Sequence, residues 1–385
     1  MKRIFIFILF YACLLGSGQA QEIHFSQIGA NPLIINPANA GMFYEDTRVG
    51  LTTRNQWFNI ANPAKTMSLY IDGRKYFEIP WRKRRNIVIP LDLTIGLSVC
   101  KFQGGAGNLN VTSVLPVFGL KYDILSIFTP KGRLSVSMAT GLSLIDKNLE
   151  FNKLTFNDQW NPNEYVFDPS IQTGEPYHSK SYHNFATPVG ICAMLFVPEE
   201  SFAASAGISE FYQIIKNDDS FYDLHTHVDP ICKFHAEVGV TLKKVPIHFY
   251  LLSMNQYFED NKWYEIFNFS NIITMQNIIG FNVCVAVKDY DVIWGFGSRN
   301  NKFANYDDYN FRDVFISLGF SVKQLTVIGN YDLNVSRFHY GTNYQGALEL
   351  TVKYTISSRT NIYKTSTPVY EVNKKPFSFP TATFD

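Results

Sequence analysis

Apolar side chains occupy every second position through much of this chain, with small or polar side chains between them. Over 313–323 the apolar set is Val314, Ile316, Leu318, Phe320 and Val322. The same alternation runs through 133–144, 233–243 and 348–356. Because consecutive side chains of a strand point to opposite faces, the pattern predicts strands with one apolar and one polar face. No stretch keeps a helical period for long, so the fold is expected to be all-β.

The alternation predicts about fourteen antiparallel strands. They are expected near 48–58, 65–73, 93–102, 110–122, 133–149, 187–197, 201–209, 231–243, 246–257, 270–288, 291–299, 313–322, 325–335 and 345–356. The connections are short at 198–200, 244–245, 289–290 and 323–324, and long at 150–186, 210–230, 258–269, 300–312 and 336–344. Outer-membrane barrels have this asymmetry, with tight periplasmic turns and long outer loops. Two connections on the expected short side, 74–92 and 123–132, are long and break the pattern.

The composition of the polar face separates a membrane barrel from a soluble sandwich, which alternates in the same way. Here it holds mainly Ser, Thr, Gly and Ala, with occasional charges such as Arg48, Arg54, Glu237 and Glu349. Charged residues make up only 17% of the chain and aromatic residues 16%, whereas charged residues reach about 25% in average soluble proteins. We therefore expect a single outer-membrane β-barrel with a polar lumen.

The two ends of the chain fit this compartment. Residues 1–20 have a basic start, an apolar run and a small-residue ending at Ala20, which predicts a secretory signal peptide. No later stretch has the roughly 18 apolar residues that a membrane helix needs. The expected organisation is a signal peptide over 1–20, an N-terminal periplasmic or plug segment over 21–47, the barrel over 48–356 and a periplasmic tail over 357–385.

Several classes of function lack support in the sequence. The net charge of +1 argues against nucleic acid as a partner, because phosphate binding needs a clustered basic surface. Neither a GxSxG elbow nor an HExxH motif is present, and 103–108 lacks the Lys and Ser/Thr of a phosphate loop. We therefore expect no catalytic activity and no cofactor. His225 and His227 lie between two aspartates. They fit either a metal site at a loop tip or ordinary polar loop residues. We interpret them as polar loop residues and expect no metal site.

Three blocks of sequence carry a family resemblance. Residues 23–57, IHFSQIGANPLIINPANAGMFYEDTRVGLTTRNQW, resemble the amino-terminal signature of the PorP/SprF family of Bacteroidetes outer-membrane proteins, which is associated with type IX secretion and gliding motility. The blocks LTFNDQWNPNEYVFDPSIQTGEP, 154–176, and NYDLNVSRFHYGTNYQGALELTVKY, 330–354, agree in order. The chain departs from the family pattern in the basic run WRKRR, 81–85, and in its tail after Ile356.

The resemblance implies an accessory component of type IX secretion and gliding in the cell outer membrane. Such a barrel receives or anchors a secreted surface adhesin, or its C-terminal sorting domain, and meets periplasmic components of the machinery. The alternative is a passive outer-membrane transporter for a small apolar or amphipathic solute. The two differ in the lumen, because transport needs an open or gated path.

The stretch NPLIINPANAG, 31–41, interrupts the strand pattern with two Asn-Pro pairs. Pro32 and Pro37 fix φ and push Asn31 and Asn36 away from the helical region, which predicts a series of turns. The segment is either a plug in the barrel or a periplasmic lead-in to the first strand.

Two further sets of residues are candidate contact sites. The loop 150–186 carries four aromatic residues that are candidates for binding the adhesin: Trp160, Tyr165, Phe167 and Tyr177. The alternative is that they pack onto the barrel rim. The basic run Trp81, Arg82, Lys83, Arg84 and Arg85 is a candidate periplasmic contact, with anionic head groups of the outer-membrane lipid or with an acidic partner; the alternative is a solvated turn.

Overall fold

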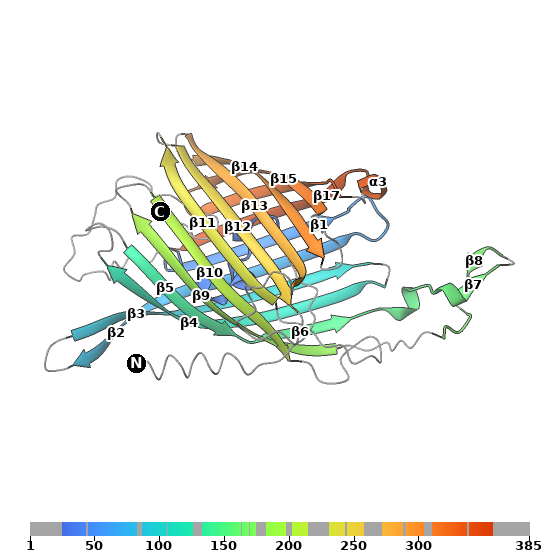
Figure 1. Ribbon diagram of the computed structural model, residues 1–385, viewed down its shortest axis with the longest axis horizontal. Coiled ribbons are helices and arrows are strands. Elements are labelled where there is room, and N and C mark those ends of the chain that lie inside the picture. Colours follow the sequence, from blue (N-terminus) through green and yellow to red (C-terminus); the bar gives the residue numbers. More distant parts are fainter. Residues whose placement is uncertain are drawn as a thin grey trace.

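The chain folds into one closed antiparallel β-barrel (Figure 1). The computed structural model describes residues 25–43, 45–82, 87–105, 107–125, 133–162, 164–168, 170–174, 182–197, 202–214, 231–242, 245–257, 272–287, 290–303, 310–336 and 339–356. The expected signal peptide, 1–20, and the expected tail, 357–385, lie outside these residues.

The barrel strands follow one another around the wall in chain order. Their bounds are β1 Thr47–Gln56, β2 Ala64–Arg82, β3 Ile87–Gly104, β4 Leu109–Leu125, β5 Arg133–Gly141, β6 Ser143–Asn148, β9 Tyr182–Val197, β10 Phe202–Ile214, β11 Ile231–Leu242, β12 Val245–Tyr257, β13 Ile272–Val287, β14 Tyr290–Phe303, β15 Asn310–Val322, β16 Leu325–Asn334 and β17 Gln345–Ile356.

Closure depends on two features of the pairing. β1 pairs with β2 on one side and with β17 on the other, so the first and last strands are neighbours. β5 and β6 both lie between β4 and β9 and are separated only by Leu142, so together they span the wall once. Counted over the described residues, the barrel has 14 strands, which confirms the predicted fold and strand number.

The two rims of the barrel differ in their connections. We call the rim where β1 begins and β17 ends the short-turn rim; Thr47 faces Ile356 there, and only Lys323 and Gln324 separate β15 from β16. The opposite rim, the long-loop rim, carries the connection from β6 to β9, with the short strands β7 Trp160–Asn161 and β8 Val166–Phe167. It also carries the short helix α3 His339–Thr342, between β16 and β17. In Figure 1 both lie at the right.

The prediction of a long connection over 74–92 is wrong. β2 and β3 continue as a hairpin that pairs as far as Arg82 with Ile87, so only 83–86 separate the two strands. The hairpin extends past the short-turn rim (Figure 1, lower left). The expected connection 123–132 is also shorter, because β4 runs to Leu125 and β5 begins at Arg133.

The alternation of side chains matches the two faces of the wall. On β15, Ile316, Leu318 and Phe320 are exposed on the outside, while Phe315 and Ser317 are fully buried inside. An apolar outer surface on a closed barrel is the arrangement that a bilayer stabilises. In the described part of the chain, no helix has the length and apolar character to span a membrane.

The four cysteines after the expected signal peptide, Cys100, Cys192, Cys232 and Cys284, have free thiols. Cys100 points into the lumen, where it contacts Asn31 and Ser68. The barrel is therefore held by its strand pairing and its interior contacts, without a disulfide bond between these cysteines.

Candidate functional site: an occupied lumen

Residues Phe25–Phe43, here called the lumen segment, lie inside the barrel. They form three short helical turns, η1 Ile28–Ala30, α2 Pro32–Ile35 and η2 Pro37–Asn39. In the lumen segment Ser26, Ala30, Leu33 and Asn36 are at most 1% exposed. Side chains from strands on all sides of the barrel contact the segment, as described below.

The two Asn-Pro pairs start two of these turns. Asn31 has extended backbone angles and its side chain accepts a hydrogen bond from the Leu33 N–H, while Pro32 is the first residue of α2. Asn36 caps η2 in the same way, with Pro37 following it. Asparagine before a helix satisfies an otherwise unpaired N–H, and proline at the first helical position lacks the N–H that would be unpaired anyway. The predicted turns are therefore capped helical turns.

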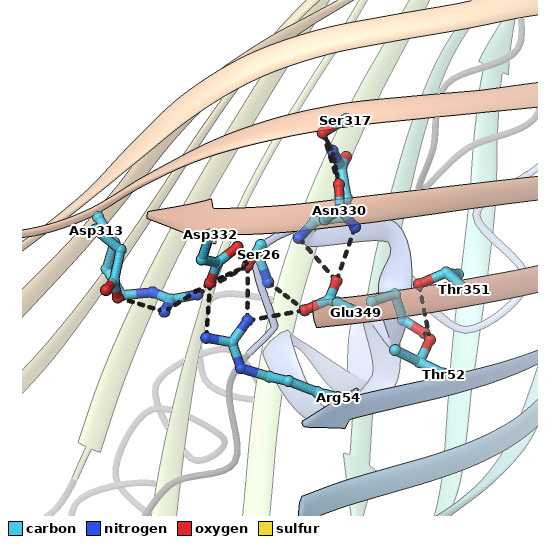
Figure 2. A network of polar contacts seen from close by, with 12 residues as sticks. Ser26, Thr52, Arg54, Asp313, Ser317, Asn330, Asp332, Glu349 and Thr351 are labelled. Carbon is cyan, nitrogen blue, oxygen red and sulfur yellow. Dashed lines mark hydrogen bonds and ion pairs between the residues drawn. The ribbon is translucent and has the colours of Figure 1, made fainter. Parts of the chain in front are cut away.

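A network of charges fixes the start of the lumen segment (Figure 2). Arg54 of β1 donates to Asp332 of β16 at 2.7 Å and to Glu349 of β17 at 3.1 Å. Ser26 lies between these groups, with its N–H donating to Glu349 at 2.9 Å and its hydroxyl to Asp332 at 2.8 Å. The Arg54 guanidinium also donates to the Ser26 hydroxyl at 2.7 Å. The segment thus completes the coordination of a buried ion cluster.

The same cluster extends to β14 and β15. Arg299 pairs with Asp313 at 3.0 Å and lies 3.6 Å from Asp332. Its guanidinium also donates to the Ser26 hydroxyl, at 3.2 Å. Gln27 continues the contacts, because its amide donates to Ser317 at 2.6 Å and to Asn330 at 3.1 Å. Asn282 of β13 donates to the Gln27 side-chain oxygen at 3.2 Å, so six strands converge on Ser26 and Gln27.

The middle of the lumen segment is held mainly by neutral groups. Thr52 of β1 donates to the Ala30 carbonyl at 3.0 Å. The Asn31 amide donates to Ser68 of β2 at 2.6 Å and to Ser98 of β3 at 2.7 Å. Apolar side chains of the segment pack on buried wall residues; one cluster includes Leu33, Tyr70 and Leu115, and another includes Ile28, Tyr250 and Phe315.

Asn36 inserts against the backbone of β9 and β10. Its amide donates to the carbonyls of Ile191 at 3.0 Å and Ile208 at 3.3 Å. The approach requires glycine on the wall, because a Cβ at Gly190 would lie 1.9 Å from the Asn36 side-chain oxygen and one at Gly207 would lie 2.7 Å from its nitrogen.

Two polar wall groups bind the segment beside Asn36. Ser209 donates to the Ile35 carbonyl and the Lys233 ammonium to the Ile34 carbonyl, each at 2.6 Å. These contacts satisfy backbone oxygens of α2, which a helix of four residues leaves without intrahelical partners.

A bidentate ion pair fixes the end of the lumen segment at the short-turn rim. Arg48 of β1 binds both carboxylate oxygens of Asp72, at 3.0 and 2.9 Å. The Gly41 N–H donates to the same carboxylate at 3.0 Å. The Arg48 guanidinium also lies 4.4 Å from the centre of the Phe43 ring. These groups lie at the opposite end of β1 from Arg54 and Ser26.

The loop between β6 and β9 carries a second candidate site. Trp160 and Phe167 face each other across the β7–β8 pair with ring centroids 5.0 Å apart. Trp160 is 41%, Tyr165 79% and Phe167 44% exposed. β7 and β8 lie far from the wall in Figure 1. Tyr177 lies outside the described residues.

The base of this loop is closed by Asp158 and Gln159. The Gly174 N–H and the Thr173 hydroxyl donate to Asp158, and these hydrogen bonds lower the pKa of its carboxyl from the usual value. Gln159 donates to the Ile171 carbonyl at 2.9 Å and accepts from the Phe156 N–H at 3.1 Å. The loop therefore has a folded base that presents the β7–β8 hairpin.

The remaining sequence candidates are only partly placed. Trp81 and Arg82 are the last residues of β2, whereas Lys83, Arg84 and Arg85 lie outside the described residues. His225 and His227 also lie outside them. The described residues contain no cluster of His, Cys, Asp and Glu able to hold a metal ion.

Sequence reasoning missed wall residues that bind the lumen segment, chiefly Asp332 and Arg299, and it also missed Asp313, the partner of Arg299. A signal was present for one of them. Asp332 and its neighbour in the cluster, Glu349, both belong to the block 330–354, and Ser26 belongs to the block 23–57. Two of the three blocks that carried the family resemblance thus contact each other inside the barrel.

A closed barrel with an apolar exterior defines this chain as a β-barrel membrane protein. The family model described as "Type IX secretion system membrane protein PorP/SprF" matches residues 17–354. The chain belongs to this family, and it is an outer-membrane barrel. The family is in general non-enzymatic, and membership implies partners within the type IX secretion system.

Solved structures that resemble the chain are outer-membrane proteins of low identity. The translocator domain of the autotransporter NalP from Neisseria meningitidis is 11% identical, with 81% of this chain and 89% of that chain covered and a TM-score of 0.29. OmpF of Salmonella typhi, in complex with daunomycin, is 10% identical, with coverage of 81% and 97% and a TM-score of 0.35. BamA from Haemophilus ducreyi lacking POTRA domains 1–3 is 7% identical, with coverage of 81% and 71% and a TM-score of 0.39. Comparison with curated proteins gives no match.

Proposed function

We propose that this barrel receives or anchors a secreted surface adhesin, with its lumen closed by the lumen segment acting as a plug. The observation that carries the proposal is the filled lumen. Ser26, Asn31 and Asn36 each form hydrogen bonds to different strands of the wall. The hydrogen-bonding groups of the lumen segment and of the wall are buried together. A conduit needs a path through these contacts, whereas an anchor does not. The occupied lumen therefore favours anchoring over passive transport of a small solute.

Deletion of residues 31–41 tests the plug. The wild-type barrel in a planar bilayer should stay closed, and the deletion should open a steady conductance, because Asn31, Asn36 and their turns leave the lumen. The Gly329→Ala variant is a matched control, because its added Cβ meets nothing closer than 3.7 Å and should leave the barrel closed. Equal conductance of wild type and deletion would contradict the plug, and solute flux through the wild type would restore the transporter.

The partner surface proposed on the long-loop rim consists of Trp160, Tyr165 and Phe167, together with Tyr177. Exposed aromatic residues on a folded loop supply much of the binding energy in protein interfaces. Trp160→Ala and Tyr165→Ala should each lower the amount of large surface protein that co-purifies in mild detergent by about tenfold, which corresponds to about 1.4 kcal/mol. Tyr340→Ala, on α3, removes a side chain of similar exposure, 81%, and should have little effect. Undiminished co-purification from both loop variants would remove this surface from the proposal.

Sidedness follows from the proposal. The long-loop rim faces outward, and the run Trp81–Arg85 at the end of the β2–β3 hairpin faces the periplasm, where acidic groups of the machinery would meet it. Cysteines at Asn163 and Lys83, in a background without the native cysteines, report it through an impermeant maleimide on whole cells. Asn163→Cys should label and Lys83→Cys should not. The reverse result would invert the topology and the partner roles.

A further inference from the structure

The direction of the lumen segment determines where the amino terminus leaves the barrel. Three inward-facing residues of β1 contact the segment in reverse order: Arg54 meets Ser26, Thr52 meets the Ala30 carbonyl, and Arg48 meets the Asn39 carbonyl. β1 itself runs from the short-turn rim at Thr47 to the long-loop rim at Gln56. The segment therefore runs antiparallel to β1, with Ser26 at the level of the long-loop rim.

Contacts on other strands give the same depth for Ser26. Asp332, which accepts from the Ser26 hydroxyl, is two residues before the end of β16 at Asn334. Asp313, which pairs with Arg299 beside Ser26, is three residues after the start of β15 at Asn310. Both positions lie at the long-loop rim. At the other end of the segment, Gly41 binds Asp72, close to the short-turn rim.

Chain length restricts the exit to one rim. With cleavage after Ala20, five residues, 21–25, precede Ser26, and five residues span at most about 18 Å. Arg54 is two residues from the end of β1 at Gln56, or about 7 Å along the strand, but seven residues from its start at Thr47, or about 23 Å. From Ser26 the mature amino terminus can reach the long-loop rim, and it cannot return to the short-turn rim.

We infer that the mature amino terminus emerges at the long-loop rim. The lumen segment then crosses the interior of the barrel from that rim to the short-turn rim, where β1 begins. This differs from a periplasmic lead-in, one of the two arrangements expected for 21–47. Combined with the sidedness in the proposed function, on which this step rests, it puts the terminal amine on the cell surface, at the rim that carries α3 and the connection from β6 to β9. A partner bound there meets the free end of the segment, while the attachment to β1 lies at the opposite rim.

Single cysteines at Glu22, Tyr165 and Lys323, in a background with Cys100, Cys192, Cys232 and Cys284 replaced by serine, test the inference. Tyr165 marks the long-loop rim and Lys323 the short-turn rim. Whole cells are treated with an impermeant maleimide, before and after permeabilisation of the outer membrane. Glu22→Cys should label to within about twofold of Tyr165→Cys, and Lys323→Cys should label only after permeabilisation.

Two outcomes overturn the inference. In the first, Glu22→Cys has the accessibility of Lys323→Cys and not that of Tyr165→Cys, so that it labels only after permeabilisation while Tyr165→Cys labels on intact cells. In the second, Glu22→Cys labels in neither state. If Lys323→Cys labels on intact cells while Glu22→Cys and Tyr165→Cys are both protected, the proposed sidedness fails but the shared rim stands. Should the serine background not fold, an epitope inserted after Gln21 in the otherwise native chain is probed with antibody on intact cells. Antibody binding supports the inference, and binding only after permeabilisation overturns it.

Discussion

Arg54 illustrates how single residues stabilise a charged interior. Its side chain is 3% exposed, and its partners Asp332 and Glu349 are fully buried. Burying a charge is costly unless it is paired and hydrogen-bonded. Ser26 supplies further donors to the same carboxylates, so the lumen segment and the wall satisfy each other's polar groups.

Arg54→Ala should therefore destabilise the barrel strongly. Removing one partner of a buried pair costs about 3–5 kcal/mol, because the remaining charge is left without compensation. Urea unfolding in detergent, followed by tryptophan fluorescence, measures the loss. Lys153→Ala is the control, since Lys153 pairs with Glu150 at 51% and 36% side-chain exposure, where removal should cost under about 1 kcal/mol. A small effect of Arg54→Ala would mean that water enters the cluster.

Gly190→Ala should expel the lumen segment while the barrel stays folded. The added Cβ would overlap the Asn36 side chain at 1.9 Å, and its other near neighbours are Asn36 and Pro37 atoms of the same segment. Limited proteolysis should then cleave within 25–43, whereas the burial of this segment should protect it in the wild type and in Gly329→Ala. Continued protection in Gly190→Ala would show that β9 can shift to accept the methyl group.

At the scale of elements, the alternation predicted strands better than it predicted their ends. The predicted strands 231–243 and 345–356 correspond closely to Ile231–Leu242 and Gln345–Ile356. The extension of β2 and β3 was missed because prolines and the basic run interrupt the apolar pattern there. The lumen contacts were missed because alternation tells which face a residue occupies and not which distant residue it meets; Ser26 and Asp332 are 306 positions apart.

The prolines of the β2–β3 hairpin lie where their missing N–H groups do no harm. The Arg74 N–H points toward the β1 side, where it donates to the Asp46 carbonyl. Backbone nitrogens of a strand point alternately to its two sides, and Pro80 is six residues after Arg74, so the Pro80 nitrogen points to the β1 side as well. Among the described residues, β1 pairs with β2 no further than Gly73. Pro90 lies opposite Glu78, and its nitrogen points away from β2. It lies beyond Asp92, where the pairing of β3 with β4 ends. Proline on an exposed edge hinders pairing with another chain.

Replacing both Pro80 and Pro90 with valine should promote self-association, because each edge regains a donor. Size-exclusion chromatography with light scattering in detergent should show a shift toward dimers and larger species at the same protein concentration. The control replaces Ile79 and Ile89, which face each other within the hairpin, with valine and adds no donor. Equal elution of both double variants and the wild type would show that the edges are covered in another way.

At the scale of the whole molecule, two sets of contacts hold the barrel: the hydrogen bonds between neighbouring strands close the wall, and the lumen segment fills the interior. The ladder joins β17 to β1 and satisfies backbone groups without water. The lumen segment adds bonds between strands that are not neighbours, since Ser26 links β1, β14, β16 and β17, and Asn36 reaches β9 and β10. The segment therefore braces the wall from within as well as obstructing it.

Heating in SDS should separate the two contributions. Unboiled wild-type protein should migrate differently from boiled protein, because a closed barrel resists SDS until heat breaks its ladder. The variant without residues 31–41 should still give the folded band at room temperature, since every inter-strand pair remains, but should convert to the unfolded band at a lower temperature. The shortened chain also draws Ser26 away from Asp332, so Arg54 loses part of its coordination. Conversion at the wild-type temperature would show that the segment obstructs the lumen without bracing it, and identical migration of boiled and unboiled wild type would contradict a closed barrel altogether.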